Sequence, residues 1–457
     1  MLLSRLNDVV WSPWLLGLFL AAGLYYSLRT GFFQLFRIPL WLRTTFGAML
    51  RRRGRGNGRG ISQFQALATA LASTIGTGSI AGVATAIFYG GPGAVFWMWV
   101  SALLGMMTGC AEKLLSVRYR RAGPAGWLGG PMYYIRDGLK SPLLAGWFAL
   151  ACLPATLTGG DMVQSSSIAA ALQATFGWDR LAVGTAVAVL TGLVMVGGIG
   201  RIARVSSGLV PAMALLYLGG GAAVLAVRAD QIPEAMALIF CSALRPEAAV
   251  GGGMGYTLAA ALRYGVARGV FTNEAGLGTS AMAHAAAEVD CPARQGMWGI
   301  VEVCVSTLLV CTATALVILV SGVYGPADAL VRGALGAVPP DRLGAPLTAA
   351  AFSSVLGPWG GAVVSLSLLL FAFSSILGWS WYGEQSILYL TGSRRLVPAY
   401  RLVFLSCVVL GSVWEGEAVW ELVDLCNALM AIPNLTALLL LSPQVLRELR
   451  DWERTRG

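Results

Sequence analysis

The second apolar segment of this chain is interrupted by the sequence Ser73-Thr74-Ile75-Gly76-Thr77-Gly78-Ser79. A further interruption, Val250-Gly251-Gly252-Gly253-Met254-Gly255, lies at the start of the seventh apolar segment. Glycine inside a helix costs about 1 kcal/mol relative to alanine, so we predict that both segments are broken helices. Two broken helices, five segments apart, indicate inverted repeats around a binding site at the membrane midplane.

The composition places the surrounding chain in lipid. Of its 457 residues, 56% are hydrophobic and 12% are charged, and the mean hydropathy is +0.70. A soluble chain carries about 25% charged residues, so too little polar surface is available to cover a globule in water. A transmembrane helix needs about 20 mostly apolar residues. We predict eleven such helices, over residues 9–28, 64–89, 93–117, 143–173, 180–198, 206–227, 247–270, 297–322, 359–390, 398–414 and 418–442.

The basic residues are concentrated in alternate loops. With the N-terminus outside, all but six of the 32 Lys and Arg residues face inward, in the loops at 29–63, 113–142, 199–205, 263–296 and 391–401 and in the tail after 443. This bias follows the positive-inside rule and predicts a multi-pass protein of the cell membrane with a cytoplasmic C-terminus. It also explains the net charge of +10 through topology and contact with lipid. No interleaved aromatic residues indicate a nucleic-acid partner.

We predict an all-α polytopic membrane protein without a separate soluble domain. Helices 2–6 and 7–11 form two five-helix repeats, and the first helix is an addition. The predicted divisions are an extra helix with a basic loop, the two repeats, and a cytoplasmic tail, at 1–60, 61–230, 231–443 and 444–457. The repeat is argued from the spacing of the two breaks, because the halves share no convincing sequence identity.

Other classes of protein are disfavoured by what the helices contain. The helices contain no nucleophile–base pair that would indicate an enzyme. A channel pore is typically lined by rings of polar residues, and the chain has broken helices instead. The eight cysteines include no CxxC pair, and the one histidine, His284, makes a metal centre or metal cofactor unfavourable. The pattern leaves the oligomeric state open.

Several sequence blocks occur in the order of one transporter family. They are Thr77–Ile87, Gly90–Gly105, Gly129–Ile135, Arg268–Gly278, Ala283–Ala287 and Phe371–Trp379, followed by Tyr382-Gly383-Glu384. Together they resemble the alanine or glycine:cation symporter family from about residue 60 to residue 392. The resemblance implies the five-plus-five inverted-repeat fold of the leucine transporter and its relatives. It also implies import of alanine or glycine with Na⁺, or in some members with H⁺.

The first break has the chemistry to hold the carboxylate of an amino acid. Unwound backbone at Gly76-Thr77-Gly78 offers N–H groups at the N-terminus of a half-helix, and glycine permits close approach. A small-residue helix contact is the alternative. The resemblance adds Gln164, which is expected to face the substrate, and Trp379, which is expected to wall the pocket. Helix–helix contact for the glutamine and interfacial anchoring for the tryptophan stay open.

The second break is expected to complete the substrate site. We assign to it Gly252, Gly253 and Met254, with Thr257 one turn further.

A sodium site is predicted beside the first break, because Na⁺ prefers carbonyl and hydroxyl oxygens. Unwinding frees carbonyls near Ala72 and Ile75. The resemblance implies that the carbonyl of Phe371 and the hydroxyls of Ser374 and Ser375 complete the site. The alternative for the two serines is hydrogen bonding to the preceding helical turn.

Three positions depart from the family pattern. Ser79 and Asp161 stand where Asn is usual, and Ser306 stands where an Asp-Thr pair is common. Ser79 belongs to the expected substrate pocket, so its identity puts a preference for alanine or glycine in question. Asp161 is an ionisable residue within a membrane helix and therefore a functional candidate. It could bind the substrate amine, carry a proton, or lie wetted near a helix entrance.

Further charged residues are expected to have structural roles. We expect Glu274 and Glu384 to form gate or capping ion pairs near Arg268 and Arg394, and Glu302 to pair with a cytoplasmic arginine.

Overall fold

Helices dominate the structure, a computed structural model that describes residues 2–47, 60–123, 126–244, 258–324, 344–414 and 417–455. The elements of the first half are α1 (Leu2–Val10), α2 (Pro13–Arg29), α3 (Phe33–Phe36), α4 (Ile38–Thr44), α6 (Gln63–Thr74), η1 (Gly78–Gly82), α7 (Val83–Gly90), α8 (Gly93–Arg118), β1 (Arg121–Gly123), β2 (Gly126–Leu128), α9 (Pro131–Gly138), α10 (Pro142–Leu157), η2 (Thr158–Met162), α11 (Val163–Phe176), α12 (Arg180–Met195), α13 (Gly198–Val227), η3 (Ala229–Gln231) and α14 (Ile232–Leu244).

The second half contains helices only, among the residues described. They are α15 (Leu258–Asn273), α16 (Ala281–Ala285), α17 (Pro292–Val303), η4 (Cys304–Cys311), α18 (Thr312–Val320), α20 (Ala345–Leu356), α21 (Pro358–Thr391), η6 (Arg394–Leu396), α22 (Val397–Val413), α23 (Glu417–Leu440) and α24 (Ser442–Arg454). The strands β1 and β2 pair antiparallel with each other.

The prediction of an all-α polytopic membrane protein is confirmed. In the described ranges, seven helices are long and apolar enough to cross a membrane, or eight if one bent pair is a single span. Three of the eleven expected spans fall short of this criterion, because α2, α12 and α15 have 17, 16 and 16 described residues.

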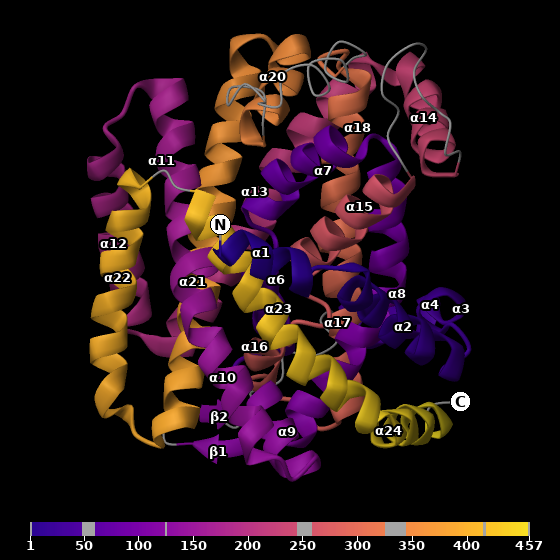
Figure 1. The fold of residues 1–457 in the computed structure, drawn as a ribbon, viewed down its shortest axis with the longest axis vertical. Helices are drawn as coiled ribbons and strands as arrows, with labels where there is room; N and C mark the ends of the chain where they lie inside the picture. The colour runs from indigo at the N-terminus through magenta and orange to yellow at the C-terminus, as the bar shows by residue number, and fades with distance from the viewer. Residues whose placement is uncertain are drawn as a thin grey trace.

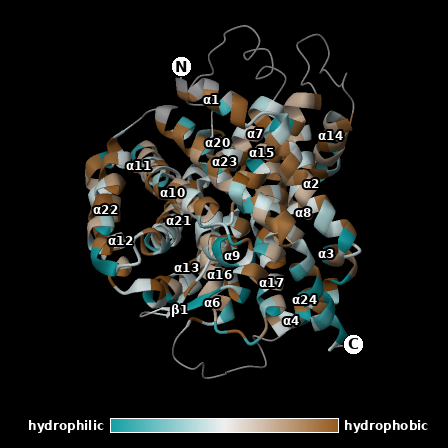
Figure 2. Ribbon diagram, turned by 60° about the horizontal axis from the view of Figure 1, so that its bottom comes forward, coloured by the Kyte–Doolittle hydropathy of each residue, from teal (hydrophilic) through white to brown (hydrophobic). Residues whose placement is uncertain are grey.

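Large apolar side chains point outward from the bundle, as lipid requires. Leu143, Val196, Leu215 and Leu402 are 87%, 72%, 76% and 69% exposed. Hydrophobic colour covers outer helices such as α11 and α22, whereas hydrophilic residues gather around α9, β1 and α24 (Figure 2).

The first predicted helix break is confirmed. Helix α6 and the pair η1–α7 form two arms bent by 54° at a short break. Helix α6 begins with a capping box, in which Ser62 and Gln65 satisfy each other's backbone N–H groups. It ends at Thr74, just before the glycines that interrupt the pattern.

A second break in the described structure follows helix α15. Residues 245–257, with the predicted positions Gly252, Gly253, Met254 and Thr257, lie outside the described residues. The described part of this segment is α15, which ends at Asn273, and seven non-helical residues separate it from α16. The backbone φ is positive at Glu274, Gly276 and Gly278, with values of 53°, 97° and 82°, so the helix cannot continue through this segment.

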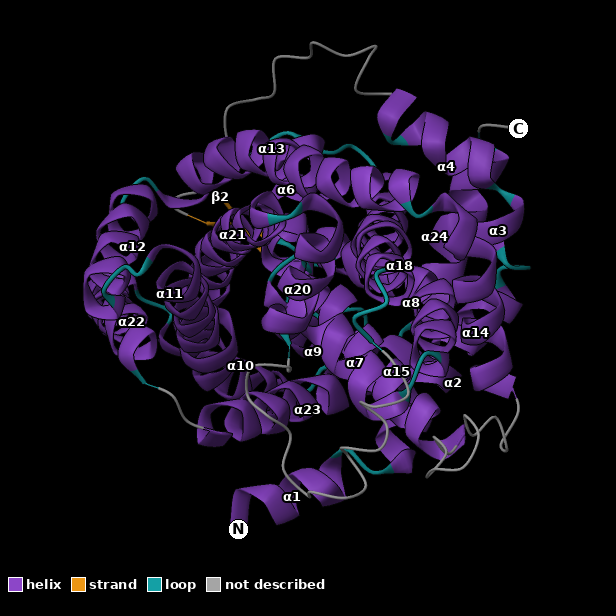
Figure 3. Ribbon diagram, turned by 90° about the horizontal axis from the view of Figure 1, so that it is seen from above, coloured by secondary structure: helices purple, strands orange, loops and turns teal. Residues whose placement is uncertain are grey.

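The two breaks face each other inside the bundle. Helix α8 packs against both α15 and α17, and α21 packs against α6, α10, α11 and α13. Helices α12 and α22 lie side by side at one edge (Figures 1 and 3). The elements α9, β1, β2, α16 and α24, which belong to the basic loops and tail, gather at the lower end of Figure 1.

Candidate functional site

The backbone leaves the helical path where α6 ends. The Ile75 N–H still donates to the Leu71 carbonyl at 2.8 Å, but the Gly76 N–H turns back to the Thr74 carbonyl at 3.1 Å. The next N–H, of Thr77, donates to Oε1 of Gln164 at 3.3 Å. A side chain from α11 therefore replaces the backbone carbonyl that would accept from the Thr77 N–H in a continuous helix.

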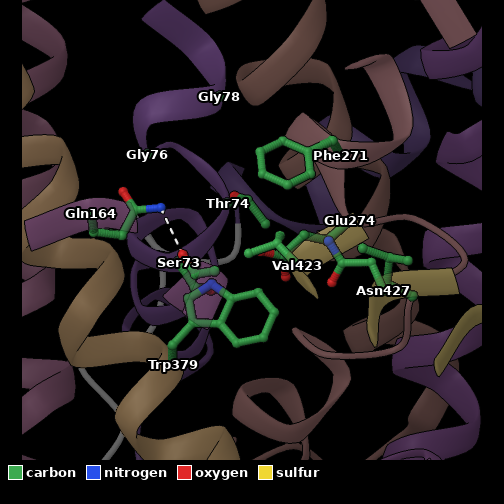
Figure 4. Close-up of a pocket in the computed structure, with 12 residues that line it drawn as sticks. Ser73, Thr74, Gly76, Gly78, Gln164, Phe271, Glu274, Trp379, Val423 and Asn427 are labelled. Atoms are coloured by element: carbon green, nitrogen blue, oxygen red, sulfur yellow. Dashed lines mark hydrogen bonds between the residues drawn. The ribbon is translucent and has the colours of Figure 1, made fainter. Parts of the chain in front are cut away.

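A small cavity lies against this break. Its volume is about 20 Å³, room for little more than one water molecule. The lining combines backbone from the break with side chains from four other parts of the chain (Figure 4): Ser73, Thr74, Gly76, Gly78, Gly159, Gln164, Phe271, Glu274, Leu277, Trp379, Val423 and Asn427. An amino acid is several times larger than water, so it fits only after these side chains move.

Gln164 is fixed in the wall of the cavity. Its Nε2 donates to the Gly159 carbonyl at 3.0 Å, the dashed line of Figure 4. That carbonyl belongs to η2, a π-helical turn that connects α10 with α11. With the amide oxygen on the Thr77 N–H, one side chain joins the two irregular backbones that border the cavity.

Glycine is required at two further contacts in this wall. A Cβ on Gly160 would lie 2.4 Å from Trp379, and one on Gly378 would lie 2.7 Å from the Cβ of Ser73. Because these distances are shorter than real contacts, η2 approaches the indole and α21 approaches α6 only because glycine is present.

The oxygen atoms expected to bind sodium lie together beside the break. The Ala72 carbonyl accepts from the hydroxyls of Ser374 and Ser375, at 3.1 and 3.0 Å. Ser374 also donates to the Phe371 carbonyl at 2.8 Å, and Ser375 to the Ser73 carbonyl at 3.2 Å. The two serines thus bridge α6 and α21.

This oxygen set suits a hard, monovalent cation. The side chains of Ser374 and Ser375 are fully buried, and neutral oxygens can coordinate Na⁺ without leaving a charged side chain in lipid. The fifth predicted residue, Ile75, is the C-cap residue that directly follows α6. The described residues contain no group of three or more His, Cys, Asp or Glu that could hold a metal ion.

Three predicted substrate residues do not line the cavity. Thr77 contributes its backbone N–H, whereas its hydroxyl is buried without a partner in the described structure. Ser79 is fully buried, and its carbonyl accepts from Thr314 at 2.9 Å. Asp161 is fully buried in η2, the element that also packs against α22.

Asp161 has neither hydrogen-bond partner nor salt bridge within the described ranges, at either carboxylate oxygen. Burying a charged carboxylate without a partner costs several kcal/mol. The observed position therefore disagrees with a wetted helix entrance.

The sequence prediction missed the parts of the cavity wall that come from α15, the break after it, and α23. Phe271, Glu274 and Leu277 come from the end of α15 and the break that follows it, and Val423 and Asn427 come from α23. The pair Gly276 and Gly278 was a signal in the sequence for this second break. Both residues have positive φ in the structure, a conformation that favours glycine. The contribution of α23 had no local signal in the sequence.

The expected ion pairs have other partners. Glu274 accepts from the Thr279 hydroxyl, and Arg268 lies over the Phe271 ring. Glu384 pairs with Arg401 rather than Arg394.

The predicted pairing of Glu302 with a cytoplasmic arginine is also wrong. Its Oε2 lies 3.4 Å from Lys113 Nζ and 3.1 Å from His284 Nε2. His284 is hydrogen-bonded at both ring nitrogens, since its Nδ1 lies 2.6 Å from Gln295 Nε2.

A bundle of apolar spans around a buried cavity at two helix breaks defines a polytopic membrane transporter. Comparison with known proteins gives the particular family: residues 1–457 match the sodium:alanine symporter family, and the chain belongs to it. It is a transporter and not an enzyme.

The relatives match along nearly their whole length. The chain is 40% identical to the sodium/alanine symporter AgcS of Methanococcus maripaludis, over 100% of this chain and 97% of the relative. It is 36% identical to the probable sodium/glutamine symporter GlnT of Bacillus subtilis, over 98% and 89%. The putative sodium/proton-dependent alanine carrier YrbD of Bacillus subtilis is also 36% identical, over 99% and 92%.

The fold is similar to that of a solved transporter. The manganese transporter of Eremococcus coleocola aligns with a TM-score of 0.53 and 15% identity, over 85% of this chain and 78% of that one. At this identity the likeness concerns the fold alone.

Proposed function

We propose that this protein imports a small neutral amino acid together with Na⁺ by alternating access. The observation that carries the proposal is the double role of the first break. On one side its backbone, Gln164 and Trp379 border the cavity. On the other, Ser374 and Ser375 converge on the Ala72 carbonyl.

The two sites share one piece of backbone, which gives a physical route for coupling. A Cβ on Gly76 would lie 2.5 Å from Ser375 Oγ and 3.1 Å from Gln164 Oε1. An ion that moves the serine hydroxyls therefore displaces the same residue that faces the substrate. Coupling requires such differential contacts between the ligand and the two states.

In this proposal the substrate binds through its carboxylate. The carboxylate takes the backbone N–H groups of Gly76-Thr77-Gly78, where the half-helix η1–α7 begins. It displaces the Thr74 carbonyl and the Gln164 amide oxygen, which accept from the Gly76 and Thr77 N–H groups in this structure. Trp379, which is 6% exposed, limits the size of the side chain. Relatives of equal identity are named for alanine and for glutamine, so the amino acid is sought with a panel.

Uptake into proteoliposomes tests the proposal. Purified protein is reconstituted, a Na⁺ gradient is imposed, and accumulation of labelled alanine, glycine, serine and glutamine is measured. We expect uphill accumulation of at least one amino acid that collapses when choline replaces Na⁺. If neither a Na⁺ nor a H⁺ gradient drives accumulation of any of them, the symporter proposal fails.

A second candidate is coupling to H⁺ through Asp161. Its support is the fully buried carboxylate that has no partner within the described ranges, since a group in such a place is stable only when neutral. Asp161→Asn separates the candidates: Na⁺ coupling predicts that Na⁺-driven accumulation persists, whereas H⁺ coupling predicts that uphill uptake is lost.

A further inference from the structure

A cluster of charged side chains is buried between α8 and α17. Glu112, Lys113 and Glu302 are fully buried. Lys113 Nζ lies 3.4 Å from Glu112 Oε2 and 3.4 Å from Glu302 Oε2, and so is shared between two carboxylates. Buried ion pairs seldom add net stability, and ionisable residues inside membrane segments are usually functional. None of these residues lines the cavity.

The carboxylate oxygen of Glu112 that does not face Lys113 holds the second helix break. Oε1 accepts from the Gly276 N–H at 2.8 Å and from the Asn434 side-chain amide at 2.7 Å. The same Asn434 amide donates to the Gly276 carbonyl at 2.9 Å. Both backbone polar groups of Gly276 are thus held by side chains from α8 and α23, and Tyr134 of α9 donates to the Asn434 carbonyl oxygen.

The segment needs such external support. The non-glycine residue Glu274 has a left-handed φ of 53°, a conformation that L-residues rarely adopt. Gly276 and Gly278 follow with φ of 97° and 82°. A Cβ on Gly276 would lie 2.5 Å from the Phe19 ring, so this residue is enclosed on its other side. Local helical hydrogen bonds cannot hold this path.

Gly276 lies between two residues of the cavity wall, Glu274 and Leu277. Their positions relative to the first break depend on where Gly276 is held. We propose that Glu112 is a positioning residue: it fixes the unwound segment 274–280 and thereby the wall of the substrate cavity opposite Gln164. Lys113 offsets its charge, and Asn434 closes the contact from α23. The role in substrate affinity rests on the proposed function, whereas the role in holding the segment does not.

Hydrogen–deuterium exchange of the purified full chain tests the holding role without any substrate. Glu112→Ala removes the acceptor of the Gly276 N–H, and we expect exchange in peptides covering 274–280 to rise at least tenfold. Glu112→Gln keeps an amide oxygen that can accept the same N–H, and we expect exchange within about threefold of the parent protein. Asn434→Ala should also raise exchange, and it carries the test if Glu112→Ala does not fold.

Glu384→Ala is the matched control. It also removes a buried, ion-paired carboxylate, since Glu384 of α21 pairs with Arg401 of α22. The hydrogen bonds of Glu384 in the described structure go to Arg401 and not to segment 274–280. We expect exchange of that segment to stay unchanged. Equal acceleration of exchange in Glu112→Ala and Glu384→Ala would mean that the whole fold is loosened and would overturn the inference. Unchanged exchange in both Glu112→Ala and Asn434→Ala would also overturn it. So would exchange in Glu112→Gln that is as fast as in Glu112→Ala.

Transport kinetics test the effect on the cavity. In Glu112→Ala we expect the KM for the transported amino acid to rise about tenfold or more, and the Na⁺ concentration for half-maximal uptake to stay within about twofold, since the serine cluster does not touch Glu112. An unchanged KM would overturn the link to the cavity. If the parent protein transports none of the amino acids, the proposed function fails, and the exchange experiment still decides whether Glu112 holds the segment.

Discussion

Gly76 is the residue at which the proposed cation site and the proposed substrate cavity meet. It is buried at the end of α6, lines the cavity, and faces Ser375 Oγ where any other residue would place its Cβ. The sequence marked it as a helix breaker. The structure adds a second reason for glycine, because the 2.5 Å approach of Ser375 Oγ excludes a side chain.

Gly76→Ala is therefore expected to damage both sites together. The new methyl group must push Ser375 away from the Ala72 carbonyl or shift Gln164. We expect Na⁺-driven uptake to fall at least tenfold, with a higher Na⁺ requirement, measured in proteoliposomes.

Gly82→Ala is the control for this prediction. Gly82 lies in η1 of the same broken helix. Outside its own stretch of helix, no atom of the described residues lies within 4 Å of the place its Cβ would occupy, so uptake should change less than twofold. Equal uptake by the Gly76 variant and the parent protein would contradict the close contact.

Among the elements, α21 contacts several of those that border the site. It packs on α6 through Gly378 and Ser73, supplies Ser374 and Ser375, and places Trp379 against η2. Near its lower end it binds α22 through Arg401, whose Nε and Nη2 lie 2.7 and 3.0 Å from the Glu384 carboxylate. The bidentate geometry fixes the angle between guanidinium and carboxylate.

Breaking this pair is expected to weaken the packing of α22 on α21. Arg401→Met leaves the buried Glu384 carboxylate without its cation, which costs about 3–5 kcal/mol for a fully buried pair and less here, since Arg401 is partly exposed. We expect a lower thermal unfolding midpoint in detergent. The double variant Glu384→Gln/Arg401→Met should recover much of the loss, because no charge is then left unpaired. A double variant less stable than Arg401→Met would contradict this account.

For the whole molecule, the packing of helices that are distant in sequence decides how the two breaks meet. The division into 61–230 and 231–443 stays a prediction. The cavity volume of about 20 Å³ is too small for an amino acid, so binding requires the residues around it to move. Ligands that bind only the folded bundle must stabilise it.

Na⁺ is therefore expected to raise the thermal unfolding midpoint. At a concentration a hundredfold above its Kd, the ion adds about 2.7 kcal/mol to the free energy of unfolding, and a matched concentration of choline should add none. The double variant Ser374→Ala/Ser375→Ala should lose this Na⁺-specific shift. If the shift survives in the double variant, the cation binds elsewhere.

The sequence by itself determined the membrane location, the apolar spans, the first helix break and the family. These properties depend on local composition: apolar runs must lie in lipid, and Gly76 and Gly78 interrupt a helix wherever it packs. Four oxygen-bearing residues of the predicted cation site, Ala72, Phe371, Ser374 and Ser375, were also found in mutual contact, because the resemblance covers both helices.

Only the tertiary structure decided the partners of the buried polar groups. Glu112 meets Gly276 across 164 positions and Asn434 across 322, and no local pattern predicts which helices become neighbours. For the same reason the sequence could not show that Gln164 lines the cavity and that Asp161, three residues earlier, does not. A helix break can be predicted from its own residues, but what holds the broken backbone depends on the elements that pack around it.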